Sequence, residues 1–211
     1  MKIVYLDVET TGIPCPQSGL VQLAGAIEIE GEVKQQFDFR IRPFPDDVIS
    51  DEALAVNGLT RDELRTYEDP AKVFNQFEAL LGAYVDRYDR TDKFHVVAYN
   101  ANFDADHLRA WFEKNHSPYF GSWFWHPPLD VMAIAAMALM PERRRIENFR
   151  LATIAARLGI EVDPAKTHDA LYDVHLARAV FGRLRERLIG HGCPGPGNVP
   201  SAQSQPLPKS S

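Results

Sequence analysis

The chain has 211 residues, of which 45% are hydrophobic and 25% are charged, and its formal net charge is −6. This length suits one sizeable α/β domain, and the composition is that of a globular protein able to bury a core without a disulfide or metal framework. The negative net charge argues against a protein that coats nucleic acid with its own basic surface. It does not exclude an enzyme that meets phosphate through bound divalent cations.

Cysteine usage and the N-terminal sequence indicate a cytoplasmic location. The two cysteines, Cys15 and Cys193, lie in Pro-containing segments and do not make a disulfide scaffold, which favours a reducing compartment. The opening segment MKIVYLDVETTG is not a signal peptide, because carboxylates interrupt its short apolar run. No stretch is apolar for long enough to span a bilayer.

The first part of the chain predicts three consecutive strands. Residues 2–8, 21–30 and 33–41 contain apolar positions at or near strand spacing, and Gly31 marks a turn between the second and the third. Strands that follow one another in this way are expected to be antiparallel neighbours.

Helices then alternate with strands. Ser50 is placed to cap a short helix, Thr60 and Glu63 have the spacing of a capping box, and Asp69-Pro70 begins a longer helix. The remaining expected elements are strands at 94–98 and 123–125 and helices at 102–115, 129–139, 148–158 and 169–188.

This order of elements predicts an α/β fold, with a mixed sheet and helices packed on its faces. Residues 1–190 are expected to form the domain. Residues 191–211 are rich in Pro, Gly and Ser and are expected to form a flexible tail.

Asp7 and Glu9 are the first candidate functional residues. They are two positions apart at the end of a predicted strand, so their side chains point to the same face. Two carboxylates in apolar surroundings repel and are costly to desolvate, and a divalent cation would compensate them. An isolated pair of this kind is more often a solvated strand end.

Two further segments carry acidic residues in positions of interest. Asp104 lies in the first turn of a predicted helix, where the helix dipole alone would stabilise it. Asp173 lies among apolar residues inside another helix, whereas Asp169 fits a capping role better. His168 precedes that helix and by itself would be read as a cap or a surface residue.

Taken together, these segments resemble the DEDDh exonucleases, which include the epsilon-type proofreading subunit of the bacterial replicative polymerase and ribonuclease T. LDVETTG is similar to their first motif, NANFD to the second and HDALYDVHLA to the third. The linking stretches VQLAGAIEI, EALAVNGLTRDEL and PLDVMAIA are also similar, so the resemblance runs from about Ile3 to Leu188.

The resemblance implies a ribonuclease H-like fold, a mixed five-stranded sheet flanked by helices. It implies that Asp7, Glu9, Asp104 and Asp173 hold two Mg²⁺ or Mn²⁺ ions, and that His168 is the general base. Two metals about 3.5–4 Å apart suit an in-line displacement at phosphorus. An imidazole with a pKa near ~6.5 suits a base that is neutral before attack. The expected product is a nucleoside 5′-monophosphate released from a 3′ end.

Substrate contacts are expected next to these groups. The resemblance suggests that Thr10, Thr11 and Gly12 present hydroxyl and N–H groups to the terminal nucleotide, although a simple turn also needs a glycine. Asn100 is a further expected contact. Phe103 either stacks near a base or packs in the core.

Two positions depart from the family pattern, because Tyr99 stands where many relatives have His and Gln22 where many have Glu. Neither belongs to the five core groups, so the departures concern substrate detail. Trp123 and Trp125 fit buried strand positions better than a stacking wedge.

Three functions remain open at this point. The first is a DNA 3′→5′ exonuclease acting in proofreading, repair or end trimming, with the 3′ end of single-stranded DNA as its expected partner. The second is an RNA 3′-end trimmer that uses the same site, because a 2′-hydroxyl contact elsewhere would decide between the sugars. The third is a non-catalytic domain that binds a DNA polymerase subunit, against which the intact set of five residues argues.

Overall fold

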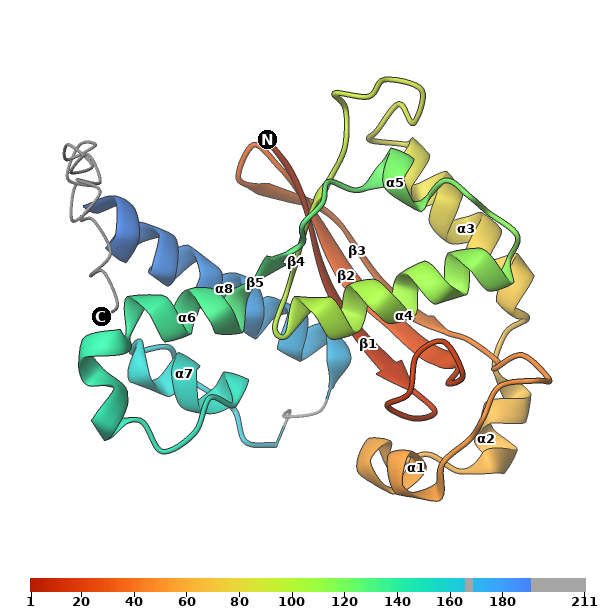
Figure 1. Cartoon of the computed structure of the whole chain (residues 1–211), viewed down its shortest axis with the longest axis horizontal. Coiled ribbons are helices and arrows are strands. Elements are labelled where there is room, and N and C mark those ends of the chain that lie inside the picture. Colours follow the sequence, from red (N-terminus) through yellow and green to blue (C-terminus); the bar gives the residue numbers. More distant parts are fainter. Residues whose placement is uncertain (166–168, 191–211) are drawn as a thin grey trace, which may run out of the picture.

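The computed structural model describes residues 1–165 and 169–190. Its centre is a five-stranded sheet in the order β3-β2-β1-β4-β5, with helices on both faces (Figure 1). The tail predicted at 191–211 lies outside the described residues. Within the described part of the chain, no helix is both long and apolar enough to cross a membrane.

The sheet is mixed, as predicted. β1 (Lys2–Thr10) pairs antiparallel with β2 (Leu20–Ile29), which pairs antiparallel with β3 (Glu32–Arg40). β4 (His95–Ala98) and β5 (Leu129–Asp130) continue the sheet in parallel on the other side of β1. β1 is therefore a central strand, and its apolar residues are buried on both faces.

The helices between β3 and β4 begin where the sequence places their caps. Ser50 Oγ accepts a hydrogen bond from the N–H of Ala53 in α1 (Asp51–Asn57). Thr60 and Glu63 form both bonds of a capping box in α2 (Arg61–Thr66). Asp69 caps α3 (Pro70–Gly82). These capping hydrogen bonds join residues within one helical turn, so they depend little on tertiary packing.

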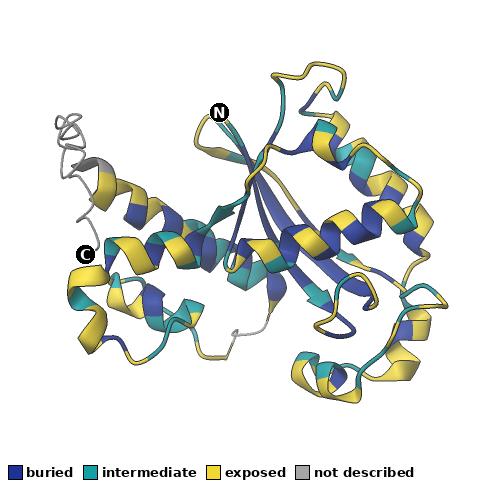
Figure 2. Ribbon diagram, viewed as in Figure 1, coloured by how far each residue is buried: buried dark blue, intermediate teal, exposed yellow. Residues whose placement is uncertain are grey.

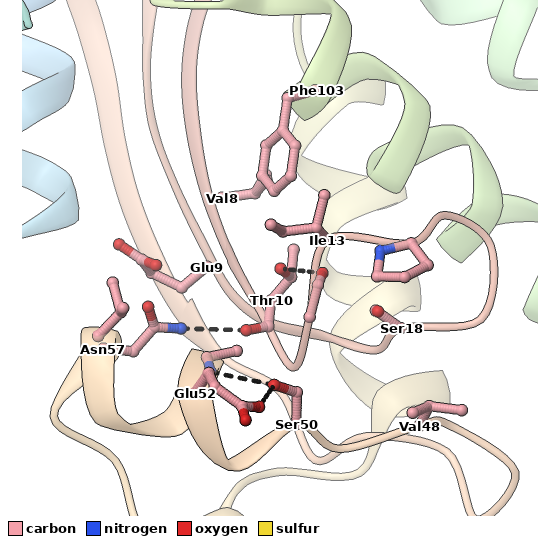
Figure 3. A pocket seen from close by; sticks show the side chains of 14 residues that line it. Val8, Glu9, Thr10, Ile13, Ser18, Val48, Ser50, Glu52, Asn57 and Phe103 are labelled. Carbon is pink, nitrogen blue, oxygen red and sulfur yellow. Dashed lines mark hydrogen bonds between the residues drawn. The ribbon is translucent and has the colours of Figure 1, made fainter.

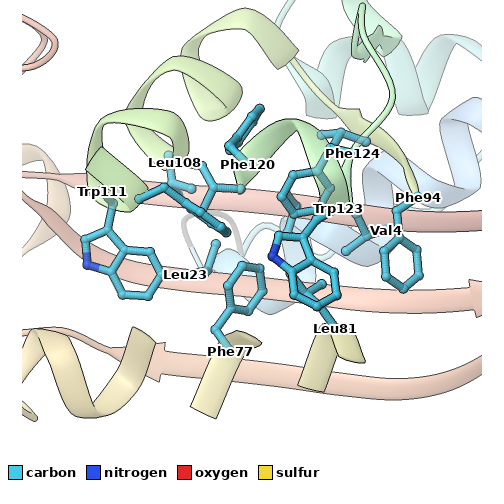
Figure 4. Packing of buried hydrophobic residues seen from close by; sticks show 14 of the residues in the cluster. Val4, Leu23, Phe77, Leu81, Phe94, Leu108, Trp111, Phe120, Trp123 and Phe124 are labelled. Carbon is cyan, nitrogen blue, oxygen red and sulfur yellow. The ribbon is translucent and has the colours of Figure 1, made fainter. Parts of the chain in front are cut away.

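One face of the sheet is covered by α3, α4 (Ala101–Lys114) and α5 (Phe120–Trp123). The aromatic rings between them are tightly packed, with Phe74 and Phe112 centroids 4.8 Å apart and Phe77 and Trp111 centroids 6.1 Å apart (Figure 4). Full burial of one such ring contributes about 1.5–3 kcal/mol. This cluster fixes α4 against the sheet.

The opposite face is covered by α6 (Val131–Ala138), α7 (Leu151–Arg157) and α8 (Ala170–Gly190). α8 packs on β1 and β2, and its inner residues are buried while its outer ones are exposed (Figures 1 and 2). The even-numbered apolar residues of β1 belong to the first cluster, and Ile3 and Tyr5 belong to the second. Successive side chains of β1 thus point alternately into two separate hydrophobic cores, one on each face of the sheet.

The prediction of a strand at 123–125 was wrong. Trp123 ends α5, Phe124 makes only an isolated bridge with Phe94, and the fifth strand is Leu129–Asp130. Pro127 and Pro128 have no backbone N–H to donate to a neighbouring strand, so pairing stops before them and resumes after them.

The helices after β5 differ from the expected bounds at both ends. They begin one to three residues later than expected, and they end one residue earlier in α6 and α7 and two residues later in α8. The helix expected at 129–139 starts as α6 after the two residues of β5. The helix expected at 148–158 starts at Leu151, because Asn148 Oδ1 accepts the Arg150 N–H at 3.0 Å and the Thr153 hydroxyl at 2.7 Å. The preceding arginine run lies in a 3₁₀ helix, η1 (Met140–Arg145).

Candidate active site

Asp7 and Glu9 lie near the end of β1, on the face that α8 covers. They continue the odd-numbered series of Ile3 and Tyr5, whose side chains pack in the α8 core. Both carboxylates are half-buried. The prediction that the two side chains share a face is consistent with this alternation, and the fold adds which helix they face.

Asp104 approaches the same strand end from α4. Its side chain is only 3% exposed, and its Oδ1 accepts a hydrogen bond from the backbone N–H of Val8 at 3.1 Å. Burial raises the pKa of Asp104 to about 8, and the charges of Asp130 and Glu9 add to this rise, while the bond from Val8 opposes it. A carboxyl in the first turn of a helix is therefore bonded directly to the strand that carries Asp7.

Asp173 comes from the first turns of α8. Asp169 caps this helix, since its Oδ1 accepts the N–H of Tyr172 at 2.9 Å, as the sequence indicated. Further along, Arg178 Nε donates to the buried carboxylate of Glu28 on β2 at 2.7 Å. The cap and this ion pair hold α8 across the sheet with Asp173 on the side of Asp7.

The other three carboxylates each lie near enough to Asp7 to act on its charge. Burial is the largest cause of its strongly raised pKa, and the charges of Asp104, Glu9 and Asp173 raise it further. These groups come from the first strand, the fourth helix and the last helix of the domain. The fold therefore brings together the four acidic residues that the sequence singled out.

The donor set is suited to a hard divalent cation. All four side chains offer carboxylate oxygens, the ligands that Mg²⁺ and Mn²⁺ prefer, and a cation would offset the mutual repulsion that raises the pKa of Asp7. Within residues 1–165 and 169–190, no three acidic, His or Cys side chains already form a finished metal-binding group. Side-chain rotation would be needed to close the four carboxylates around an ion.

His168 lies outside the described residues, and its role stays a prediction. The turn of Thr10, Thr11 and Gly12 after Glu9 is held by side-chain hydrogen bonds. Thr10 Oγ1 donates to the Gly12 carbonyl at 2.8 Å, and Thr11 Oγ1 donates to the Val48 carbonyl at 2.6 Å. Both hydroxyls thus hold the turn, and contacts from these three residues to a nucleotide stay predictions.

A cleft of about 640 Å³ opens beside this turn (Figure 3). Glu9 lies at its edge, and Asn57 ties α1 to the turn by donating from Nδ2 to the Thr10 carbonyl at 3.1 Å. Phe103 projects into the cleft from α4 in Figure 3 while it also packs against the first core. Both roles that the sequence left open for Phe103 are therefore compatible with its position.

The cleft is lined by apolar side chains that the sequence reasoning missed. Ile13 is 82% exposed, Val56 is 73% exposed and Val48 is 57% exposed. Exposed branched residues gathered around one cleft are typical of a ligand-binding surface. The available signal was an isoleucine directly after the Thr-Thr-Gly turn and a valine on the outer side of a short amphipathic helix.

The structure describes Asn100 and the two residues that depart from the family pattern, Tyr99 and Gln22. Asn100 is exposed at the start of α4, with φ 70° and its N–H donating to Asp130 Oδ1 at 3.1 Å. Tyr99 donates its hydroxyl to the Phe149 carbonyl at 2.6 Å, and burial raises its pKa. Gln22 is buried and donates to Asp38 at 2.8 Å. Both departures are thus satisfied by contacts within the protein.

Known proteins share this sequence pattern and this arrangement. The sequence model of a family described as Exonuclease (RNase_T) matches residues 4–181. The chain is 29% identical over 186 residues to "DNA polymerase III PolC-type" of Thermotoga maritima, which covers 88% of this chain and 12% of the relative. It is 28% identical over 189 residues to the protein of the same name from Bacillus cereus, covering 90% of this chain and 12% of the relative.

Solved structures resemble the fold as well. A zinc-bound complex of E. coli exonuclease I with single-stranded DNA aligns with a TM-score of 0.70 at 22% identity, covering 90% of this chain and 41% of the other. Another exonuclease I structure aligns with a TM-score of 0.69 at 23% identity, covering 88% and 40%. The chain thus spans less than half the length of these proteins. The prediction of a ribonuclease H-like fold is confirmed.

Proposed function

The chain belongs to the exonuclease family with the DEDDh motifs, and we propose that it is a metal-dependent 3′→5′ exonuclease that releases nucleoside 5′-monophosphates from DNA. The observation that supports this best is the convergence of Asp104 from α4 and Asp173 from α8 on the end of β1 that carries Asp7 and Glu9. Carboxylates that are far apart in sequence and repel one another in a half-buried place need a compensating cation.

The proposed ligands of two Mg²⁺ or Mn²⁺ ions are Asp7, Glu9, Asp104 and Asp173. Bound divalent cations would supply the charge that activates water and stabilises the leaving oxygen of a phosphodiester. Asp104 is positioned for its part by the N–H of Val8, which donates to its Oδ1. Asp7 and Glu9 are held by the ladder between β1 and β2.

His168 is the proposed general base, on the strength of the family motif. It would take a proton from the attacking water, which requires the neutral imidazole. Its place in the chain directly precedes Asp169, the cap of α8, four residues before Asp173. Loss of this imidazole should therefore remove turnover while the four carboxylates still bind metal.

The cleft next to Glu9 is the proposed binding place of the terminal nucleotide. Its apolar wall of Ile13, Val48 and Val56 suits the face of a base, and Glu9 at its edge would put the adjoining phosphate beside the carboxylates. Thr10, Thr11, Gly12, Asn100 and Phe103 are the further proposed contacts.

DNA is the proposed polymer because of the names of the relatives. The curated relatives are named DNA polymerase III PolC-type, and one solved neighbour holds single-stranded DNA. Association with a DNA polymerase subunit is proposed on the same ground.

The test is a degradation assay with 3′- and 5′-labelled single-stranded DNA, duplex DNA and RNA, in Mg²⁺, Mn²⁺ or EDTA. We expect shortening from the 3′ end of single-stranded DNA, with nucleoside 5′-monophosphates as products and no activity in EDTA. Asp7→Ala should lose both turnover and calorimetric metal binding, whereas His168→Ala should lose turnover alone. Asp106→Ala, an exposed carboxylate on α4, is the matched control and should behave as the unsubstituted protein. Turnover that persists in EDTA or in Asp7→Ala would overturn the metal mechanism, and a preference for RNA would overturn the choice of polymer.

A further inference from the structure

A second cavity, of about 520 Å³, lies on the other side of α4 from the nucleotide cleft. Phe103 lines the cleft, whereas Ala105 and Arg109 line this cavity, and two positions along a helix are about 200° apart around its axis. The remaining walls come from α5, from Lys93 before β4 and from the segment that leads to β5. None of its lining residues is acidic.

The cavity concentrates positive charge in an acidic chain. Lys93 and Arg109 are in none of the ion pairs found within residues 1–165 and 169–190, a property they share with Arg90, Arg150, Arg185 and the arginines of η1. The Arg109 guanidinium instead lies 4.1 Å from the centroid of the Phe120 ring. Lys93 Nζ lies 5.1 Å from the Trp125 ring and donates to the Gly121 carbonyl at 2.6 Å. Cations held by rings and carbonyls keep their charge for an anion from outside.

An exposed aromatic surface adjoins these cations. Trp125 is 36% exposed, whereas its neighbours Trp123 and Phe124 are each 3% exposed. The Phe120 and Phe124 rings belong to the aromatic core and lie 5.5 Å and 6.2 Å from the ring of Phe112 on α4 (Figure 4). Alternating cationic groups and aromatic surface match the alternating phosphates and bases of a single strand. The sequence suggested a buried strand position for Trp125, but its side chain lies partly at the surface, although its backbone N–H donates to the Phe94 carbonyl at 2.9 Å.

The cavity is also near the proposed site. Ala105 directly follows Asp104, and Val96 pairs with Val4, three residues before Asp7 on β1. At a strand rise of about 3.3 Å per residue, Val96 lies about 10 Å from Asp7 along the sheet, and Lys93, three residues before Val96, lies about 20 Å from it. A strand with its 3′ end in the cleft would cross the start of α4 and reach the cavity after a few nucleotides.

We propose that this cavity binds the single strand upstream of its 3′ end, with Arg109 and Lys93 on phosphates and Trp125 against a base. This inference rests on the proposed function, because it takes the same strand as its ligand. It explains how a chain of net charge −6 can hold a polyanion at a place away from the carboxylates.

The test compares Arg109→Glu, Lys93→Glu and Trp125→Ala on substrates of two lengths. The p-nitrophenyl ester of thymidine 5′-monophosphate fills only the cleft, whereas an oligothymidylate also reaches the cavity. We expect KM for the oligonucleotide to rise at least about fivefold in each variant, the factor that loss of one stacked base or charged contact brings. Hydrolysis of the ester should be unchanged. The slope of log affinity against log salt should decrease by about 1 for each phosphate contact removed.

The matched control is Arg185→Glu. Arg185 lies on α8, on the opposite face of the sheet, and its guanidinium is 5.7 Å from the Phe181 ring. The substitution therefore makes the same change of charge in the same kind of ring contact. An equal loss of oligonucleotide affinity in this control would reduce the effect to net charge and overturn the proposal. Unchanged oligonucleotide affinity in all three cavity variants would also overturn it. So would variants that lose only the binding of a fluorescent acidic peptide, because the cavity would then be a peptide site.

Oligonucleotide affinity is also measured directly by fluorescence anisotropy in Ca²⁺. If the unsubstituted protein fails to hydrolyse the ester, the proposed function fails, and the anisotropy comparison still decides the cavity. If the ester is hydrolysed equally by all variants and anisotropy is unaffected, only the cavity proposal fails.

Discussion

A substitution at Asp104 can measure how much the four clustered carboxylates, Asp7, Glu9, Asp104 and Asp173, lower the free energy of unfolding. Its carboxyl is almost completely buried, and burial with the nearby negative charges raises its pKa from 3.8 to about 8. Between about pH 4 and pH 8, Asp104 therefore stays protonated in the folded protein but is ionised in the unfolded chain. Without metal, the stability contributed by the neutral acid is complete below about pH 4 and is lost as the pH rises toward 8.

The substitution Asp104→Asn separates this charge from the hydrogen bond. In the unsubstituted protein, the Val8 N–H donates to Asp104 Oδ1 at 3.1 Å. The asparagine Oδ1 can still accept this hydrogen bond, but the asparagine side chain stays neutral at every pH. A pKa rise of about four units corresponds to about 5–6 kcal/mol. Sharing of the proton with Asp7 and local relaxation reduce this, so we expect a gain of about 2–4 kcal/mol at pH 8 in EDTA. For a domain of this size, that gain corresponds to about 5–15 °C in melting temperature.

The assay is thermal unfolding followed by circular dichroism at pH 5 and pH 8, in EDTA and in Mg²⁺. Asp104→Asn should melt above the unsubstituted protein at pH 8 in EDTA, and the difference should shrink at pH 5. Added Mg²⁺ should stabilise the unsubstituted protein and have little effect on the variant. Asp106→Asn, on the exposed side of the same helix, should show neither effect. A variant that melts at or below the unsubstituted protein at pH 8 would refute the assignment of a buried, charge-strained Asp104.

Three further predictions concern the rest of the fold and the cleft. Gly25→Ala should lower the free energy of unfolding by about 2–4 kcal/mol in urea, because its Cβ would lie 2.3 Å from the Phe37 ring. Ile13→Ser should raise KM for DNA about fivefold without moving the melting temperature, since this apolar side chain is 82% exposed and lines the cleft. Glu28→Gln should weaken metal binding measured by calorimetry and cost about 1–3 kcal/mol in urea, because it breaks the ion pair with Arg178 that holds α8.

Features with short-range causes could be predicted from the sequence. The caps at Ser50, Thr60 and Asp69 were correctly placed because each involves residues within one helical turn. The first three strands were found because their alternation and turn are local. Asp104 was recognised from its position in a helix start within a motif. The hydrogen bond from Val8, 96 residues away, could not be predicted from spacing.

Features that depend on tertiary neighbours were not predictable in this way. β5 has only two residues, so no periodic pattern marks it, and it forms because Val97 and Ala98 offer a free strand edge. Ile13 looks like any loop residue until the fold places Val56 of α1 across from it. Trp125 was expected at a buried strand position, but only an isolated bridge forms beside it, and its side chain is 36% exposed.

The position of the acidic cluster follows from the way β1 is buried. A charge is costly to bury along a central strand that is covered on both faces, so carboxylates are tolerated best where the strand ends. Asp7 and Glu9 face the α8 core there, while Asp104 arrives from the α4 core on the other face. The distance between the carboxylates is therefore set by two hydrophobic clusters that share only the strand itself. A cavity made in either cluster would shift one helix and leave the other in place, so core substitutions remote from the cluster should weaken metal binding before they unfold the domain.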